Sequence, residues 1–178
     1  MAGVRESRQL EILAQLFQNR LLDKFREQLG ESYSPQVYNS WPLDMETGGQ
    51  VLALAQIQPR AVPMFFATAD QIAADLIARP PSADELDRVT EPLKQKLNRA
   101  STSSAYFMSM LEGASQDPRK YGSIRNLLPD YTQTTPAEMQ ALAKRYLTRG
   151  KSWRLAVIPE GTTLATTITP GPARGAAQ

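Results

Sequence analysis

The sequence predicts an α+β domain in which an antiparallel or mixed sheet packs against helices on one face. Three observations lead to this prediction. A long amphipathic helix pattern opens the chain, two segments with strand patterning follow it, and several helix patterns then precede one last strand pattern. A strand that arrives alone after several helices needs the earlier strands as partners. We therefore expect all three strands in one narrow sheet, which strands outside this chain would complete.

The first third of the chain is expected to form a helix followed by a hairpin. Apolar residues recur every three or four positions over residues 7–29, and Gly30 then provides a helix stop. Aromatic or alternating apolar side chains predict strands over residues 32–41 and 50–58. A proline and a Gly-Gly pair lie between these segments, so an antiparallel hairpin is the simplest connection.

The middle of the chain carries helical spacing and helix-start signals. Ser82 with Glu85 forms a capping-box pattern, and Thr135 with Glu138 repeats it. Asp117 before a proline is typical of an N-cap followed by proline at the first helical position. The helices are expected at residues 65–77, 82–97 with a bend at Pro92, 106–111, 118–128 and 136–147.

Alternation of Trp153, Leu155 and Val157 predicts the last strand over residues 152–158. The domain is therefore expected to span residues 1–158. Residues 159–178 are rich in Thr, Pro, Gly and Ala and offer too little apolar surface to offset the entropy of ordering them. We expect them to form a flexible tail.

Composition excludes several functions. The chain contains no Cys and no His, so thiol catalysis, a Ser-His-Asp triad and the usual zinc ligand sets are unavailable in it. Lys and Arg number 20 against 18 Asp and Glu, and this net charge of +2 gives no indication of nucleic-acid binding. The sequence has no run of about 18 apolar residues, so no membrane partner is expected. No cofactor is expected in this chain.

Four short segments resemble one family of peptidases. Residues 21–34, with the sequence LLDKFREQLGESYS, are similar to a helix end followed by a strand in the second, non-metal half of pitrilysin/insulinase-type zinc metallopeptidases. Residues 82–86 (SADEL), 135–139 (TPAEM) and 143–147 (AKRYL) resemble later helix motifs of the same half, in the same order. The resemblance covers about residues 8–158 and lacks the strands that normally open that half, so the chain is expected to be truncated at its N-terminal side.

The resemblance implies a processing-peptidase-like half domain. In that family a homologous half holds zinc through an inverted His-x-x-Glu-His motif, and the other half contributes an Arg/Tyr pair. Arg26 and Tyr33 match the pair, and both side chains donate hydrogen bonds suited to a substrate carbonyl oxygen that gains negative charge. The implied partners are an unfolded polypeptide or peptide substrate and the metal-bearing half. The zinc belongs to the complete enzyme, and export to the periplasm is the compartment that the resemblance favours.

Other interpretations stay open. An Arg in the last turn of a helix interacts favourably with the helix dipole whatever its function, and a Tyr that opens a strand is commonly a packing residue. A non-catalytic assembly module of the same fold would share the segments above, and an unrelated helical interaction domain would share some by accident. The acidic residues Asp84, Glu85, Asp87 and Glu91 are expected to reflect the dipole at a helix start rather than a metal site.

Overall fold

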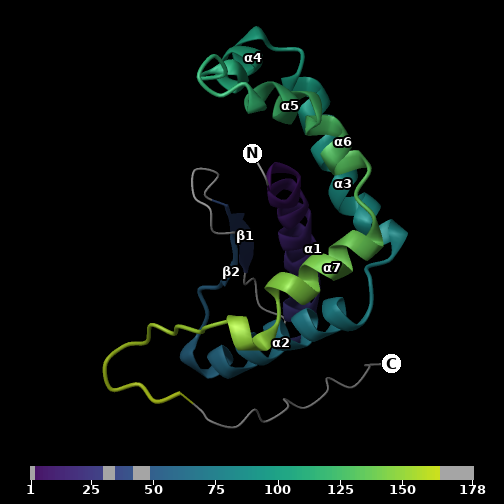
Figure 1. The fold of residues 1–178 in the computed structure, drawn as a ribbon. Helices are drawn as coiled ribbons and strands as arrows, with labels where there is room; N and C mark the ends of the chain where they lie inside the picture. The colour runs from purple at the N-terminus through teal and green to yellow at the C-terminus, as the bar shows by residue number, and fades with distance from the viewer. Residues whose placement is uncertain (1–2, 30–34, 42–48, 165–178) are drawn as a thin grey trace.

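A computed structural model describes residues 3–29, 35–41 and 49–164 (Figure 1). The protein is mostly helical, with a small antiparallel sheet. The first helix, α1 (Val4–Leu29), runs through the middle of the molecule. The hairpin lies along one side of α1, while α2 (Val62–Ala78) crosses its C-terminal end. The later helices α3 (Ala83–Ala100), α6 (Leu127–Thr132) and α7 (Pro136–Tyr146) cover its remaining sides.

The predicted antiparallel hairpin is confirmed, but its second strand, expected over residues 50–58, ends at Leu54. Strand β1 (Gln36–Ser40) pairs with β2 (Gln50–Leu54) in a register that sets Val37 opposite Ala53. α1 packs against this hairpin, and the backbone N–H of Val37 donates a 2.9 Å hydrogen bond to Oε1 of Gln18 on α1. Because side chains alternate across a strand, Val37 is buried while its neighbour Tyr38 is exposed on the opposite face.

Helix α1 is buried on more than the one face that its main stripe predicts. The expected stripe residues Leu10, Leu13 and Phe25 are buried, but Ile12 and Leu16 are fully buried as well. These two lie off the stripe on the helical wheel. They are buried because the sheet covers one side of α1 and helices cover the others. α1 is thus a central core helix that packs against the sheet on one side and against helices on its other sides.

The two capping signals locate helix starts correctly. Oγ of Ser82 accepts a 3.1 Å hydrogen bond from the backbone N–H of Glu85 at the start of α3. Thr135 and Glu138 form a complete, reciprocal capping box at the start of α7. The helix expected at 82–97 continues to residue 100, and Pro92 lies inside it without ending it.

The helix expected at residues 118–128 is divided in the structure. α5 (Arg119–Arg125) and α6 are separate helices that meet at Asn126. Pro118 occupies the N-cap position of α5, so the predicted N-cap at Asp117 and first helical position at Pro118 are wrong by one residue. The preceding helix, α4 (Ser104–Leu111), extends the one expected at 106–111 by two residues at its start. Together α4 and α5 form the outer end of an arm that α3 and α6 carry away from α1 (Figure 1).

The predicted strand over residues 152–158 is wrong. In the described part of the chain the sheet contains only β1 and β2, and residues 152–158 belong to no strand. After α7 the chain passes through a short 3-10 helix (Arg149–Lys151), passes the first half of α2 and then loops outward (Figure 1). Arg154 forms an ion pair with Asp70, and its guanidinium lies 5.5 Å from the centre of the Phe66 ring. These contacts place Arg154 beside α2.

Residues Pro59–Ala78, a 3-10 turn (Pro59–Ala61) followed by α2, are long and apolar enough to cross a membrane by length and composition alone. The core helix of a soluble protein passes the same test. Here Phe65, Ile72 and Leu76 of α2 are buried in the protein's own core. The predicted Gly30 stop and the tail after residue 164 lie outside the described residues.

Candidate functional site

Arg26 is exposed in the last turn of α1. Its neighbour Phe25 is fully buried and packs edge-on against Phe65 of α2, with ring centres 5.7 Å apart. This anchor fixes the helix end and directs the next residue outward. Arg26 makes no hydrogen bond or ion pair with another described residue. Tyr33, the other predicted site residue, lies outside the described residues.

A shallow groove lies beside this helix end. Lys24 of α1 lines it together with α2 residues that include Met64, Gln71 and Asp75. Lys24 forms a 3.2 Å ion pair with Glu27 on its own helix, and both side chains are more than half exposed. Lys24 and Arg26 thus place two cationic side chains at the carboxyl end of α1, where the helix dipole favours positive charge. Because Glu27 pairs with Lys24 and Asp75 also lines the groove, the charge in the groove is mixed.

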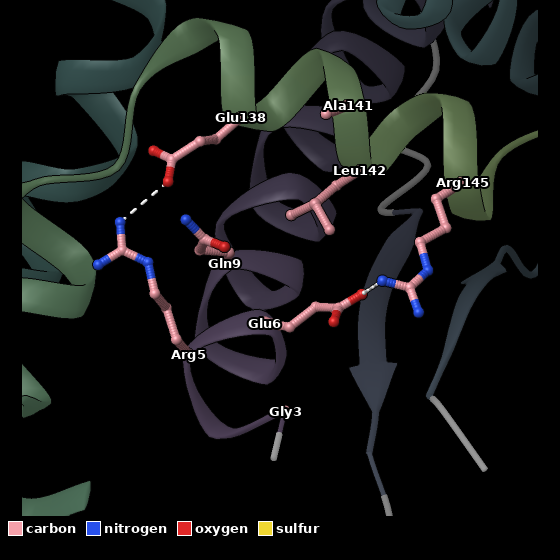
Figure 2. A pocket seen from close by; sticks show the side chains of 8 residues that line it. All are labelled: Gly3, Arg5, Glu6, Gln9, Glu138, Ala141, Leu142 and Arg145. Carbon is pink, nitrogen blue, oxygen red and sulfur yellow. Dashed lines mark hydrogen bonds and ion pairs between the residues drawn. The ribbon is translucent and has the colours of Figure 1, made fainter. Parts of the chain in front are cut away.

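A second groove lies between the start of α1 and α7 (Figure 2). Its charged groups are matched across the two helices. Arg5 donates to Glu138 over 2.9 Å, while Glu6 accepts from Arg145 and from the Tyr146 hydroxyl at 2.8 Å. Burial, together with the bond to Glu6, raises the pKa of Tyr146 to about 12. These groups hold the two helices together.

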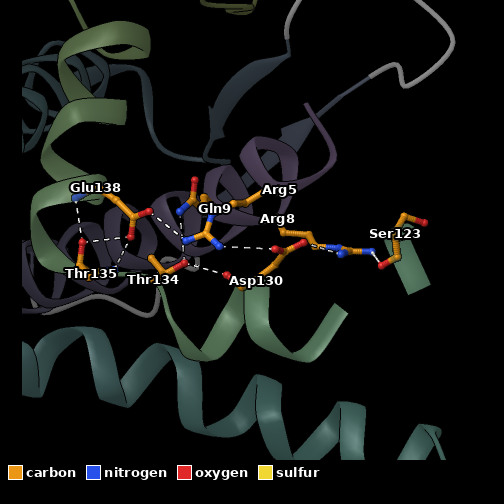
Figure 3. A network of polar contacts seen from close by, with 8 residues as sticks. All are labelled: Arg5, Arg8, Gln9, Ser123, Asp130, Thr134, Thr135 and Glu138. Carbon is orange, nitrogen blue, oxygen red and sulfur yellow. Dashed lines mark hydrogen bonds and ion pairs between the residues drawn. The ribbon is translucent and has the colours of Figure 1, made fainter. Parts of the chain in front are cut away.

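A polar network continues from this groove into the protein (Figure 3). Arg8 donates to Asp130 over 2.6 Å and to the backbone carbonyl of Ser123 over 2.9 Å. The hydroxyl of Thr134 donates to the carbonyl oxygen of Asp130 and lies 3.4 Å from the amide nitrogen of Gln9. The network ties α1 to α5 and α6. Among the described residues no buried side-chain polar atom lacks a partner, so the network is structural.

The acidic start of α3 is neutralised by basic partners. Glu85 receives two hydrogen bonds from Arg20, at 2.6 and 2.9 Å. These bonds hold the pKa of Glu85 below its usual range and raise the pKa of Arg20. Asp84 pairs with Arg88, and Glu91 pairs with Lys94. Within the described residues no three metal-ligating side chains form a group.

The sequence analysis missed the Arg8–Asp130 and Arg20–Glu85 contacts. A signal for the first was present, because Arg8 lies one helical turn before Ile12, on a side of α1 that proves to be buried. Buried arginines need a carboxylate or carbonyl partner. Nothing in the local pattern indicated that the partner would come from residue 130.

Comparison of the chain with protein-family models, with curated proteins and with solved structures found no match.

Proposed function

We propose that this chain is the substrate-binding and transition-state-supporting portion of a zinc metalloendopeptidase whose zinc site lies in another domain or subunit. The observation that carries the proposal is Arg26, an exposed guanidinium without a described partner at a rigid helix end. The position within the segment LLDKFREQLGESYS is the one at which the pitrilysin/insulinase-type resemblance places a substrate-contacting arginine.

The chemistry assigned to this chain is hydrogen-bond donation. A guanidinium offers a planar fork of donors, and a phenol offers one. Held beside the scissile peptide bond, Arg26 and Tyr33 would stabilise the negative charge that develops on the carbonyl oxygen. The metal-bearing half would supply the zinc-activated water. Because this chain has no His and no Cys, it is expected to cleave no peptide by itself.

The test is mutagenesis of the complete peptidase, assayed with a fluorogenic peptide and with zinc removed by a chelator as the blank. Arg26→Ala and Tyr33→Phe should each lower kcat by roughly ten- to a thousandfold, the scale for removing one donor to an oxyanion. Arg125→Ala is the matched control, since Arg125 is an exposed arginine on α5. It should leave kcat unchanged.

Thermal unfolding of the same variants separates catalysis from folding. Arg26 contacts no described partner, so the melting temperature of Arg26→Ala should stay near that of the unmodified protein. Full activity in both site variants, or hydrolysis that survives zinc removal, would contradict the proposal.

A non-catalytic assembly module is the second candidate. The observation that favours it is that large apolar side chains are exposed at two separate places, Met108 on α4 and Trp153 and Val157 after α7. Exposed apolar surface of this kind is typical of contacts with other proteins. If this candidate is right, Arg26→Ala and Tyr33→Phe will leave every activity of the assembly unchanged, whereas substitutions in the apolar surface will release the chain from it.

A further inference from the structure

Residues 153–158 form a ribbon with two different faces. Trp153, Leu155 and Val157 are 70, 69 and 90% exposed. The alternate positions face the protein: Arg154 contacts Asp70 and Phe66 of α2, and Ala156 and Ile158 are partly buried. Side chains that alternate in this way are the pattern of a β-strand. One face of the segment is therefore anchored, and the other presents three large apolar groups to solvent.

The backbone of this segment has no hydrogen-bonding partner in the described part of the chain. None of residues 153–158 makes a backbone hydrogen bond to another described residue. The segment is bounded by a short 3-10 helix that ends at Lys151 and by a turn in which the N–H of Thr162 donates to the carbonyl of Pro159. Between these two stops lies a run of peptide groups able to receive a strand.

Basic residues are concentrated at the N-terminal end of the segment. Residues 144–154 contain five basic side chains and no acidic one. Arg145 and Arg154 are paired with Glu6 and Asp70, while Arg149 is exposed just before the segment. A ligand strand with a carboxylate at the Arg149 end would complement this charge.

We propose that residues 153–157 bind an extended polypeptide strand from a partner protein by β-strand addition. The partner strand carries alternating apolar side chains that lie beside Trp153, Leu155 and Val157, and an acidic residue at the end near Arg149. Backbone hydrogen bonds supply affinity. The apolar side chains and the basic residue Arg149 set the alignment of the partner strand with residues 153–157. This inference does not depend on the peptidase proposal, because it uses neither Arg26 nor Tyr33.

The exposed apolar residues of α4 do not support the same inference. Phe107, Met108 and Leu111 project from a helix whose backbone groups are already bonded within it. Such a surface binds by packing alone. In residues 153–157, exposed side chains occur together with peptide groups that bond to no other described residue, and this combination selects an extended partner.

Trp153 provides a direct readout, because the chain contains only two tryptophans and Trp41→Phe removes the other. The probe is a synthetic eight-residue peptide of alternating Val and Thr that ends in two Asp. Titration into the full-length Trp41→Phe chain should shift Trp153 emission to shorter wavelength and saturate. The same peptide N-methylated at alternate residues keeps its side chains and loses donors on one edge. Two such peptides, methylated at odd or at even positions, test the two edges of the peptide strand. One of them should bind about tenfold more weakly than the unmethylated peptide.

Variants of the protein test the same point. Leu155→Pro removes a peptide N–H and Ala156→Pro removes one from the opposite edge, so one of the two should abolish binding. Tyr121→Ser is the matched control, since it removes an exposed apolar side chain from α5, and it should bind normally. Circular dichroism should be unchanged in all three, because these positions lie outside the buried core.

Three results would overturn the proposal. The first is equal affinity for the N-methylated and unmethylated peptides, which would show apolar adhesion only. The second is undiminished binding by both proline variants. The third is a concentration-dependent dimer, seen by analytical ultracentrifugation, that Leu155→Pro dissociates and that excludes the peptide. That result would assign the segment to a second copy of this chain.

Discussion

Helices α1 and α4 are both rich in apolar residues, but they have opposite surroundings. α1 buries residues around most of its circumference, whereas none of the α4 side chains is buried. The difference arises from neighbours: α1 contacts the hairpin and four helices, while α4 lies at the outer end of the arm beside α5. Apolar composition therefore predicts that a segment favours burial. Whether other elements of this chain bury it depends on the tertiary fold.

Charged residues show the same contrast. Arg8 and Asp130 form an ion pair with little solvent access, at the place where α6 packs on α1. Asp84 and Arg88 form a pair of the same chemistry on the open face of α3, where both side chains are more than two-thirds exposed. Loss of one partner from the buried pair should therefore destabilise the protein strongly. The exposed pair should contribute little, because water competes for both of its charges.

The largest effect is expected from breaking the buried pair. Asp130→Ala leaves Arg8 without its carboxylate in a poorly solvated place, so the free energy of unfolding should fall by about 3–5 kcal/mol. Asp84→Ala, the same substitution in the exposed pair, should cost less than about 1 kcal/mol. Urea denaturation of both variants measures the difference. Equal losses would mean that the two regions do not differ as described.

The apolar contrast is tested by two substitutions of the same residue type. Met139 of α7 is fully buried, whereas Met108 of α4 is 73% exposed. Met139→Ala should lower the free energy of unfolding by about 2–5 kcal/mol, because it leaves a cavity. Met108→Ala should change it by no more than about 0.5 kcal/mol. A large loss in Met108→Ala would show that α4 is covered in solution.

The Arg20–Glu85 pair is intermediate in burial, and its contribution should depend on pH. The folded state holds the pKa of Glu85 below the usual value of 4.5, so the folded protein binds this proton less readily than the unfolded chain. The stabilisation is therefore present above pH 4.5 and is lost as pH falls through the lower folded pKa. Glu85→Gln should cost about 1 kcal/mol at pH 7, after allowance for partial exposure.

Denaturation of Glu85→Gln and the unmodified protein at a series of pH values measures that dependence. The two free energies of unfolding should converge as the pH drops well below 4.5. A gap that persists unchanged in strong acid would show that Glu85 contributes by packing and not by charge.

An effect of similar size is expected at Tyr146, where only one hydroxyl is removed. Tyr146→Phe deletes the bond to Glu6 but leaves the ring packed near Trp41, with ring centres 6.2 Å apart. The free energy of unfolding should fall by about 0.5–1.5 kcal/mol at pH 7. Spectroscopic titration should also lose a tyrosine that ionises near pH 12, since burial and Glu6 raise this pKa. An unchanged titration curve would contradict the contact.

The sequence by itself determined the local elements. Periodicity located α1, alternation located the hairpin strands, and the residue pairs at Ser82 and Thr135 marked helix starts, because these signals act over a few residues. It also singled out Arg26, which the structure places exposed at a helix end. Tyr33 stays a prediction, since it lies outside the described residues.

Only the tertiary structure decided which elements meet. The pairing of Arg8 with Asp130 joins positions 122 residues apart, and the burial of Ile12 and Leu16 depends on helices that come much later in the chain. The segment after α7 has the alternation of a strand, yet in the described part of the chain it contacts Asp70 and Phe66 of α2 and joins no sheet. A strand pattern specifies which side chains share a face, but strand pairing requires a neighbour in space, and that neighbour is set by packing of the whole chain.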